Sequence, residues 1–158
     1  MNQEAKASDD PTQRWVTFHM DRETYGINVT QVREVLRITE IAPVPGAPDY
    51  VLGIINLRGN VVTVMDTRKR FSLPPTETTD STRIVIIEVD GQEVGVMVDS
   101  VAEVIDIRQS NIEPAPNVGN DDASRYIQGV SSLDGNLLIL IDLNRLLTDE
   151  ELQEMTSF

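Results

Sequence analysis

The sequence predicts a mostly β protein in which two small barrels share a hydrophobic core and a short helix follows them. Three observations predict this class. The chain contains an internal repeat, its apolar runs are short and strand-like, and turn residues separate these runs at regular spacing. Each copy of the repeat is too short to bury a large core alone, so we expect the two copies to share one.

The repeat has two matched segments in each copy. Trp15–Ile38 aligns without gaps to Ile84–Ile107, and Tyr50–Phe71 aligns to Tyr126–Leu147. The matched segments come in the same order, which is typical of a supersecondary unit used twice. The second copy is longer between its two segments, so we expect a longer loop there.

The repeat also predicts the domain organisation. One domain covers residues 15–147, with subdomain copies over about 15–71 and 84–147. Residues 1–14 are polar and contain no apolar signal core, which predicts a disordered tail. Residues 148–158 begin with Thr-Asp-Glu-Glu, a capping box that predicts a C-terminal helix.

The first strands of each copy are expected to form a hairpin. Trp15–Met20 and Tyr25–Val29 flank a polar turn, and Asp90-Gly91 marks the same turn in the second copy. The segments that follow, Val32–Ile38 and Val101–Ile107, are too short for periodicity to separate helix from strand.

A second hairpin follows in each copy. Its turn places a glycine after a polar residue, which suits the positive φ angles of tight hairpins. The strands before and after this turn are Gly53–Leu57 and Val61–Met65 in the first copy, and Gly129–Leu133 and Leu137–Ile141 in the second. The second strands, VVTVM and LLILI, have apolar residues on both faces, which predicts burial on both faces.

Four polar residues at equivalent positions are candidate caps. Thr30 and Asp99 are expected to cap a short helical turn. Asp66 and Asp142 follow the apolar strands and are expected to cap the next turn. One aspartate per copy is also the arrangement of an aspartic protease dyad, so a hydrolase that uses Asp66 and Asp142 is an alternative. The glycine of that family's motif is missing in both copies, and no other catalytic constellation is present.

Composition excludes several classes of protein. The net charge of −13 and the pI near 4.3 argue against nucleic acid and against direct contact with an anionic membrane. There is no cysteine and one histidine, His19, so we expect no metal and no cofactor. No apolar run is long enough to span a bilayer, which predicts a cytoplasmic protein.

The two copies differ in charge at one turn. The first copy carries Arg58 where the second carries Asp134, while both keep an acid, Glu34 and Glu103. Only the first copy can therefore pair its acid with its turn. Such a Glu34–Arg58 pair, next to apolar residues, is typical of a protein-binding surface; two separately solvated charges are the alternative.

Motifs in both copies match one known family. In the first copy they are Tyr25-Gly26-Ile27, Val32-Arg33-Glu34-Val35, Gly53-Ile54-Ile55-Asn56-Leu57-Arg58-Gly59 and Asp66-x-Arg68. In the second copy they are Val98-Asp99-x-Val101, Pro114-Ala115-Pro116, Gly129 to Leu133, Leu137-Leu138-Ile139-Leu140 and Leu146-Leu147. Together they resemble the CheW family of bacterial chemotaxis coupling proteins, over roughly Trp15 to Met155. Thr63 and Thr67 depart from the family pattern, where proline and leucine are usual.

The resemblance implies two five-stranded SH3-like barrels with a hydrophobic interface and no enzyme activity. It implies an adaptor that couples the cytoplasmic tip of methyl-accepting chemoreceptors to the regulatory domain of the histidine kinase CheA. It also implies a cytoplasmic location at the inner face of the membrane through receptor arrays, and leaves open contacts between CheW copies there. A CheW-like domain diverted to another partner, for array positioning, is the alternative.

The resemblance further implies which residues bind each partner. The receptor-binding residues carried over by position are Val32, Glu34, Gly53, Arg58, Ile84, Val101 and Val104. The kinase-binding candidates are Glu113 and Val118, in the longer loop of the second copy.

Overall fold

The computed structural model describes residues 10–114 and 126–142, together with Arg145, Leu147, Thr148, Glu150, Glu151 and Gln153. The strands are β1 (Thr12–Met20), β2 (Glu23–Asn28), β3 (Val32–Arg37), β4 (Val51–Leu57), β5 (Asn60–Met65), β6 (Arg83–Val89), β7 (Gln92–Val98), β8 (Ser100–Arg108), β9 (Ile127–Leu133) and β10 (Asn136–Ile141). The short helices are η1 (Val29–Gln31), α2 (Thr67–Arg70) and η2 (Gln109–Asn111). The mostly β prediction is therefore confirmed.

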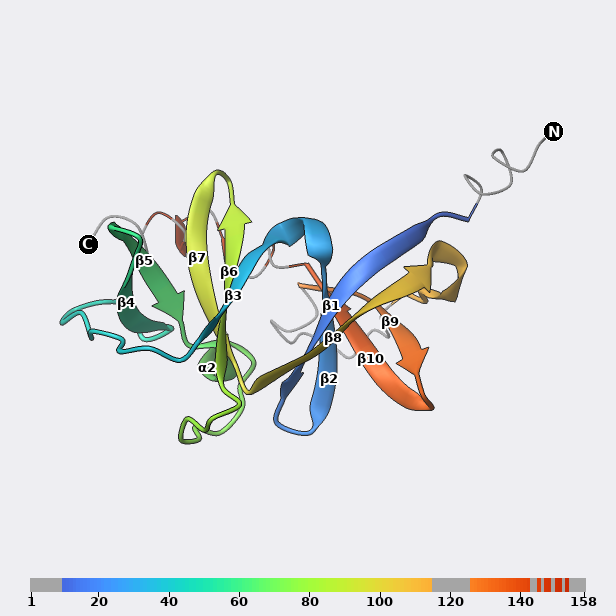
Figure 1. Cartoon of the computed structure of the whole chain (residues 1–158), viewed down its shortest axis with the longest axis horizontal. Helices are drawn as coiled ribbons and strands as arrows, with labels where there is room; N and C mark the ends of the chain where they lie inside the picture. Colours follow the sequence, from blue (N-terminus) through green and yellow to red (C-terminus); the bar gives the residue numbers. More distant parts are fainter. Residues whose placement is uncertain are drawn as a thin grey trace.

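The strands form two five-stranded sheets that lie side by side (Figure 1). Sheet A has the order β8-β1-β2-β10-β9, and sheet B has the order β3-β6-β7-β5-β4. The sheets are mixed, because β10 runs parallel to β2 and β5 runs parallel to β7, while the other pairs are antiparallel. In the described residues no ladder joins β8 to β9 or β3 to β4, so each sheet has two edge strands.

Each sheet combines strands from both copies of the repeat. Sheet A takes β1 and β2 from the first copy and β8, β9 and β10 from the second, and sheet B takes the remainder. This corrects the expectation that residues 15–71 and 84–147 each build their own barrel. The physical reason is that the chain leaves sheet A after β2 and returns to it after β7. Consequently β3 and β8 run across the middle of the molecule (Figure 1).

Three apolar clusters hold the sheets together. The largest draws on both sheets, through residues such as Phe18 and Met20 from sheet A and Ile87 and Val96 from sheet B. This confirms the predicted shared core. A second cluster lies within sheet B and a third, around Trp15, within sheet A. Burial of each such aliphatic side chain stabilises the fold by about 1.5–3 kcal/mol.

An aromatic row crosses the shared core. The ring of Phe18 stacks on Tyr25 at 5.5 Å, Tyr25 contacts Phe71 at 5.0 Å, and Phe71 stacks on Tyr126 at 5.1 Å. Burial raises the pKa of Tyr25 to about 12, and the nearby charges of Glu23 and Asp21 act in the same direction. The row therefore joins both copies through ring contacts in the shared core.

The predicted hairpin turns are present. Arg58 and Gly59 have φ angles of 53° and 86°, and Asp134 and Gly135 have φ angles of 52° and 81°. Two consecutive positive φ angles are typical of the type I′ turn, whose twist matches that of the flanking strands. The two segments that periodicity left ambiguous are strands, β3 and β8.

Several local predictions need correction. Thr12 to Arg14 belong to β1, where they pair with β8, and not to a tail. Asn28, not Thr30, caps η1, because its Oδ1 accepts a hydrogen bond from the Thr30 amide at 3.0 Å. Val61 and Leu137 begin strands predicted to be buried on both faces, yet their side chains are 68% and 54% exposed.

The C-terminal capping box is formed. The Thr148 amide donates to Glu151 Oε1 at 2.9 Å, and the Glu151 amide donates to Thr148 Oγ1 at 3.1 Å. Glu150, Glu151 and Gln153 are helical, as predicted, and the predicted end of this helix lies outside the described residues. Within the described residues, no helix has the length and apolarity needed to cross a bilayer.

Candidate protein-binding surface

The central face of the molecule is formed where β3 and β8 cross between the sheets (Figure 1). Val32 begins β3, and Val101 lies near the start of β8 at the equivalent position of the repeat. Both valines are partly exposed and pack against the shared core. Val32 and Val101, both predicted from the sequence, thus lie where the shared core reaches the surface.

A bulge follows each of these valines. The pairing of β3 with β6 shifts between Val32 and Glu34, and the pairing of β8 with β1 shifts opposite Thr17. The Thr17 hydroxyl accepts a hydrogen bond from the Glu103 amide at 3.0 Å and donates to the Glu103 carbonyl at 2.8 Å, so the second bulge has its polar groups satisfied. Bulges re-aim side chains at functional surfaces.

The bulges are followed by exposed apolar side chains. Val35 is 40% exposed and its repeat equivalent Val104 is 54% exposed. Val104 was predicted from the sequence, whereas Val35 was missed. Its equivalence to Val104 in the repeat is the signal that could have found it. Together Val32, Val35, Val101 and Val104 form what we term the valine rim.

Glu34 and Arg58 are brought together as expected. Arg58 Nη2 donates to Glu34 Oε1 at 2.6 Å, and Nη1 donates to Oε2 at 3.1 Å. The hydrogen bonds from Arg58 lower the pKa of the Glu34 carboxyl. Burial opposes this effect, and the attraction of the Arg58 charge adds to the lowering. The two parallel hydrogen bonds fix the plane of the guanidinium at β3, the strand that also carries Val32 and Val35.

Gly53 is buried and shapes the surface only by allowing the loop at Ala42 to pass close to its backbone. A Cβ at this position would lie 2.2 Å from the carbonyl oxygen of Ala42, because Ala42 and Ile54 form a bridge with two 2.9 Å hydrogen bonds. Gly129 has the same role in the second copy, where a Cβ would lie 2.8 Å from the carbonyl oxygen of Glu113. Each glycine therefore lets a loop pass directly over the sheet edge.

Three other predicted site residues lie apart from the valine rim and the Glu34–Arg58 pair. Ile84 is fully buried in the sheet B cluster, so it offers no side chain to a partner, which corrects the prediction from its position. The reason is that β6 is a central strand whose two faces are both covered. Glu113 is exposed and forms a bridge to Val130 at the edge of sheet A. Val118 lies outside the described residues.

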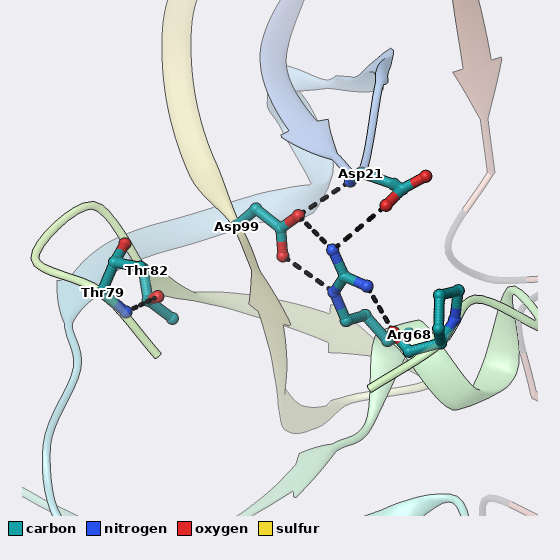
Figure 2. A network of polar contacts seen from close by, with 6 residues as sticks. Asp21, Arg68, Thr79, Thr82 and Asp99 are labelled. Carbon is teal, nitrogen blue, oxygen red and sulfur yellow. Dashed lines mark hydrogen bonds and ion pairs between the residues drawn. The ribbon is translucent and has the colours of Figure 1, made fainter. Parts of the chain in front are cut away.

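A polar network at the junction of the sheets was not predicted (Figure 2). The guanidinium of Arg68 binds Asp99, forms an ion pair with Asp21 at 3.6 Å, and donates to the carbonyl of Pro74. The Asp21 amide also donates to Asp99 Oδ2 at 2.7 Å. Asp99 is therefore part of this network and not the helix cap expected from the sequence.

The network lowers the pKa of Asp99. Burial alone would raise it, but the hydrogen bonds from Arg68 and the Asp21 amide outweigh burial. Arg68 stands in the Asp66-x-Arg68 motif, which was the available signal, although spacing alone does not reveal its partners. The network connects the β1–β2 turn, α2 and the β7–β8 junction, and so holds the two sheets on one side of the shared core.

Asp66 and Asp142 have separate structural roles. Asp66 Oδ1 accepts a hydrogen bond from the Lys69 amide at 3.1 Å and caps α2, as predicted. Asp142 Oδ1 accepts from Gln31 Nε2 at 2.9 Å, and its carbonyl accepts from the Arg145 amide at 3.0 Å. Each carboxylate thus has its own partner, the Lys69 amide for Asp66 and the Gln31 side chain for Asp142, which is not the pattern of a shared-proton dyad.

The fold and this surface define a class of protein, a two-sheet β module that binds other proteins. Comparison with known proteins agrees. The model of the CheW-like domain matches residues 14–151. The chain is similar to chemotaxis protein CheW of Bacillus subtilis, with 39% identity over 89% of this chain and 90% of the relative, and to chemotaxis protein CheW of Treponema pallidum, with 31% identity over 96% and 91%.

A solved structure gives the same answer. The crystal structure of the scaffolding protein TtCheW from Thermoanaerobacter tengcongensis superposes with a TM-score of 0.79 at 36% identity, over 86% of this chain and 92% of that one. The chain belongs to the CheW family. It is a non-enzymatic scaffold protein of chemotaxis signalling, which confirms the resemblance and excludes the hydrolase alternative.

Proposed function

We propose that this protein is the adaptor that couples the cytoplasmic tip of chemoreceptors to the regulatory domain of the histidine kinase CheA. The observation that carries the proposal is family membership over nearly the whole chain. The central face supports it, because strand β3 carries both the exposed Val35 and the acid of a charge pair of fixed geometry. Interfaces of this kind combine apolar anchors with a polar rim.

The receptor-binding surface is the valine rim together with Glu34 and Arg58. Val32 and Val101 bring the shared core to the surface, and Val35 and Val104 extend it outward. Gly53 contributes by seating the loop at Ala42 and not by direct contact. Ile84 is left out of this surface because it is buried.

The kinase-binding surface is the edge of sheet A that carries Glu113. Glu113 is exposed there and is held by two hydrogen bonds with Val130, at 2.8 and 2.9 Å. Val118, which lies outside the described residues, stays a predicted kinase contact. This surface lies on a different sheet from Arg58. The protein would reach the inner face of the membrane through the receptor.

Binding of a receptor-tip fragment by isothermal titration tests the first surface. Arg58→Asp should weaken binding at least tenfold, because it removes the cation beside Glu34 and adds a like charge. Arg22→Asp is the matched control, since Arg22 is exposed in the β1–β2 turn and makes the same change of charge elsewhere. Equal effects of the two variants would contradict the proposed surface, and no binding by the wild-type protein would contradict the function.

A further inference from the structure

Equivalent positions in the two sheets carry different charges. In sheet B, Glu34 is bound by Arg58 with hydrogen bonds of 2.6 and 3.1 Å. The repeat equivalents in sheet A are Glu103 and Asp134. The turn geometry is the same, because Arg58 and Asp134 have φ angles of 53° and 52°. A carboxylate therefore stands in sheet A where sheet B has the guanidinium that neutralises its acid.

A second cation is also missing at this end. In sheet B, Arg33 forms an ion pair with Glu88 across the β3–β6 pairing. The equivalent positions in sheet A hold Ala102 and His19. Neither Glu103 nor Asp134 forms an ion pair with any described residue. Glu34 and Glu88 of sheet B thus have ion-pair partners, whereas Glu103 and Asp134 of sheet A have none among the described residues.

The two carboxylates border one open cavity. It has a volume of about 200 Å³ and is lined by Glu103 and Asp134 together with Thr17, His19, Ala102 and Leu137. The side chain of Leu137 is 54% exposed at this cavity. The Thr17 hydroxyl donates one hydrogen bond to the backbone of Glu103 and accepts another from it, so the backbone that carries this acid is held in place.

The central face would otherwise fit a partner in two directions. β3 and β8 are repeat equivalents, and the valine rim has the same residue type at each pair of equivalent positions. A helical partner with an apolar stripe would therefore meet similar contacts in either direction. Charge complementarity is what commonly removes such an ambiguity, because it contributes more to specificity than to affinity.

We propose that the sheet A cavity receives an arginine side chain of the chemoreceptor tip, and so selects one of two directions across the central face. This rests on the proposed function. Arginine fits because its guanidinium would take the place beside Glu103 that Arg58 takes beside Glu34. Its planar fork binds a carboxylate with two hydrogen bonds, which a lysine does not reproduce. The opposite direction would place that arginine at Glu34, which is already occupied by Arg58.

The test measures direction as well as affinity. The chain has no cysteine, so Glu23→Cys in sheet A and Gln92→Cys in sheet B each give one labelling site, at exposed equivalent positions. Each carries a nitroxide, and line broadening is measured on an isotope-labelled receptor-tip fragment. In the otherwise wild-type protein, we expect the two labels to broaden two different sets of fragment resonances.

Asp134→Arg fills the cavity with an internal pair. The turn accepts arginine, since Arg58 has the same backbone conformation, so the variant should fold. We expect the affinity for the receptor-tip fragment to weaken about fivefold, as for loss of one exposed ion pair. We also expect each nitroxide label to broaden both sets of fragment resonances, because the fragment would then bind in both directions. Asp90→Arg is the matched control, because Asp90 is the turn aspartate of the β6–β7 hairpin, with a φ angle of 50°.

The outcomes separate this inference from the proposed function. Unchanged affinity and unchanged broadening in Asp134→Arg would overturn the inference, as would an equal effect of Asp90→Arg. Either result leaves the proposed function standing, because the wild-type protein still binds. Absence of binding by the wild-type protein would contradict the proposed function and this inference with it.

Discussion

Arg68 binds both carboxylate oxygens of Asp99, with Nε to Oδ1 at 3.2 Å and Nη2 to Oδ2 at 2.8 Å. The side chain of Arg68 is only 12% exposed. Arg68 follows β5 in the first copy and Asp99 follows β7 in the second, so the pair joins the copies where the chain leaves sheet B. The repeat equivalents are Asn144 and Thr30, so the sequence provides this ion pair only once.

The first prediction concerns the stability that this pair provides. Asp99→Asn should lower the free energy of unfolding by about 2 kcal/mol, because hydrogen bonds to charged groups contribute about 1.5–3 kcal/mol and Asp99 is partly exposed. Arg68→Lys should cost a similar amount, since it keeps the charge and loses the two-point contact. Urea denaturation measures both. A loss below about 0.5 kcal/mol, which is the usual effect of a neutral surface substitution, would contradict this role.

The second prediction concerns pH. The folded protein lowers the pKa of Asp99, so the unfolded chain binds its proton more readily than the folded protein does. The stabilisation is therefore complete above the unfolded pKa of about 3.9 and is lost as pH falls through the folded pKa. The difference in unfolding free energy between wild type and Asp99→Asn should shrink below about pH 4. If this difference in unfolding free energy stays constant down to roughly pH 2.5, the carboxylate of Asp99 is not the source of the stabilisation.

The third prediction concerns Gly53. Gly53→Ala should destabilise the protein by about 1–3 kcal/mol, because its Cβ would overlap the carbonyl oxygen of Ala42 and displace that loop. Gly59→Ala is the comparison, since nothing lies within 4 Å of a Cβ there and only its φ of 86° opposes alanine. Thermal unfolding should rank Gly53→Ala as the more damaging variant. The reverse order would show that backbone strain matters more than the close approach.

The fourth prediction separates Ile84 from Val104. Ile84→Ala should cost about 2–5 kcal/mol of stability, because it leaves a cavity in the sheet B cluster. Val104→Ala should change stability by less than about 0.5 kcal/mol, because that side chain is 54% exposed. Only Val104→Ala should weaken receptor binding at a temperature where both variants are folded. Titration with the receptor-tip fragment decides this.

Much of the fold could be predicted because its signals are local. The type I′ turns, the capping box at Thr148 and the cap at Asp66 each depend on residues within a few positions of one another. The exchange of strands could not be predicted in this way, because β1 pairs with β8 far along the chain. A repeat specifies which segments are equivalent, but it does not specify which copies of them pair.

The part of the binding surface that depends on the β4–β5 turn could be predicted from the sequence. Arg58 and Glu34 could be paired from the charge difference between the copies, and the structure joins them. The exposure of Ile84 could not be judged from the repeat, because the pairing of β6 at the centre of a sheet decides it. The Arg68–Asp99 pair was hidden for the same reason, since its two residues meet only after the sheets assemble.

Co-sedimentation of three components tests the central claim most directly. Receptor-tip fragments arrayed on vesicles are mixed with the isolated CheA regulatory domain, with and without this protein. The adaptor account predicts that the kinase domain enters the pellet only when this protein is present, and that Arg58→Asp removes both proteins from the pellet while Arg22→Asp does not. If this protein pellets with the receptor fragments and leaves the kinase domain in solution, it is not the coupling protein proposed here.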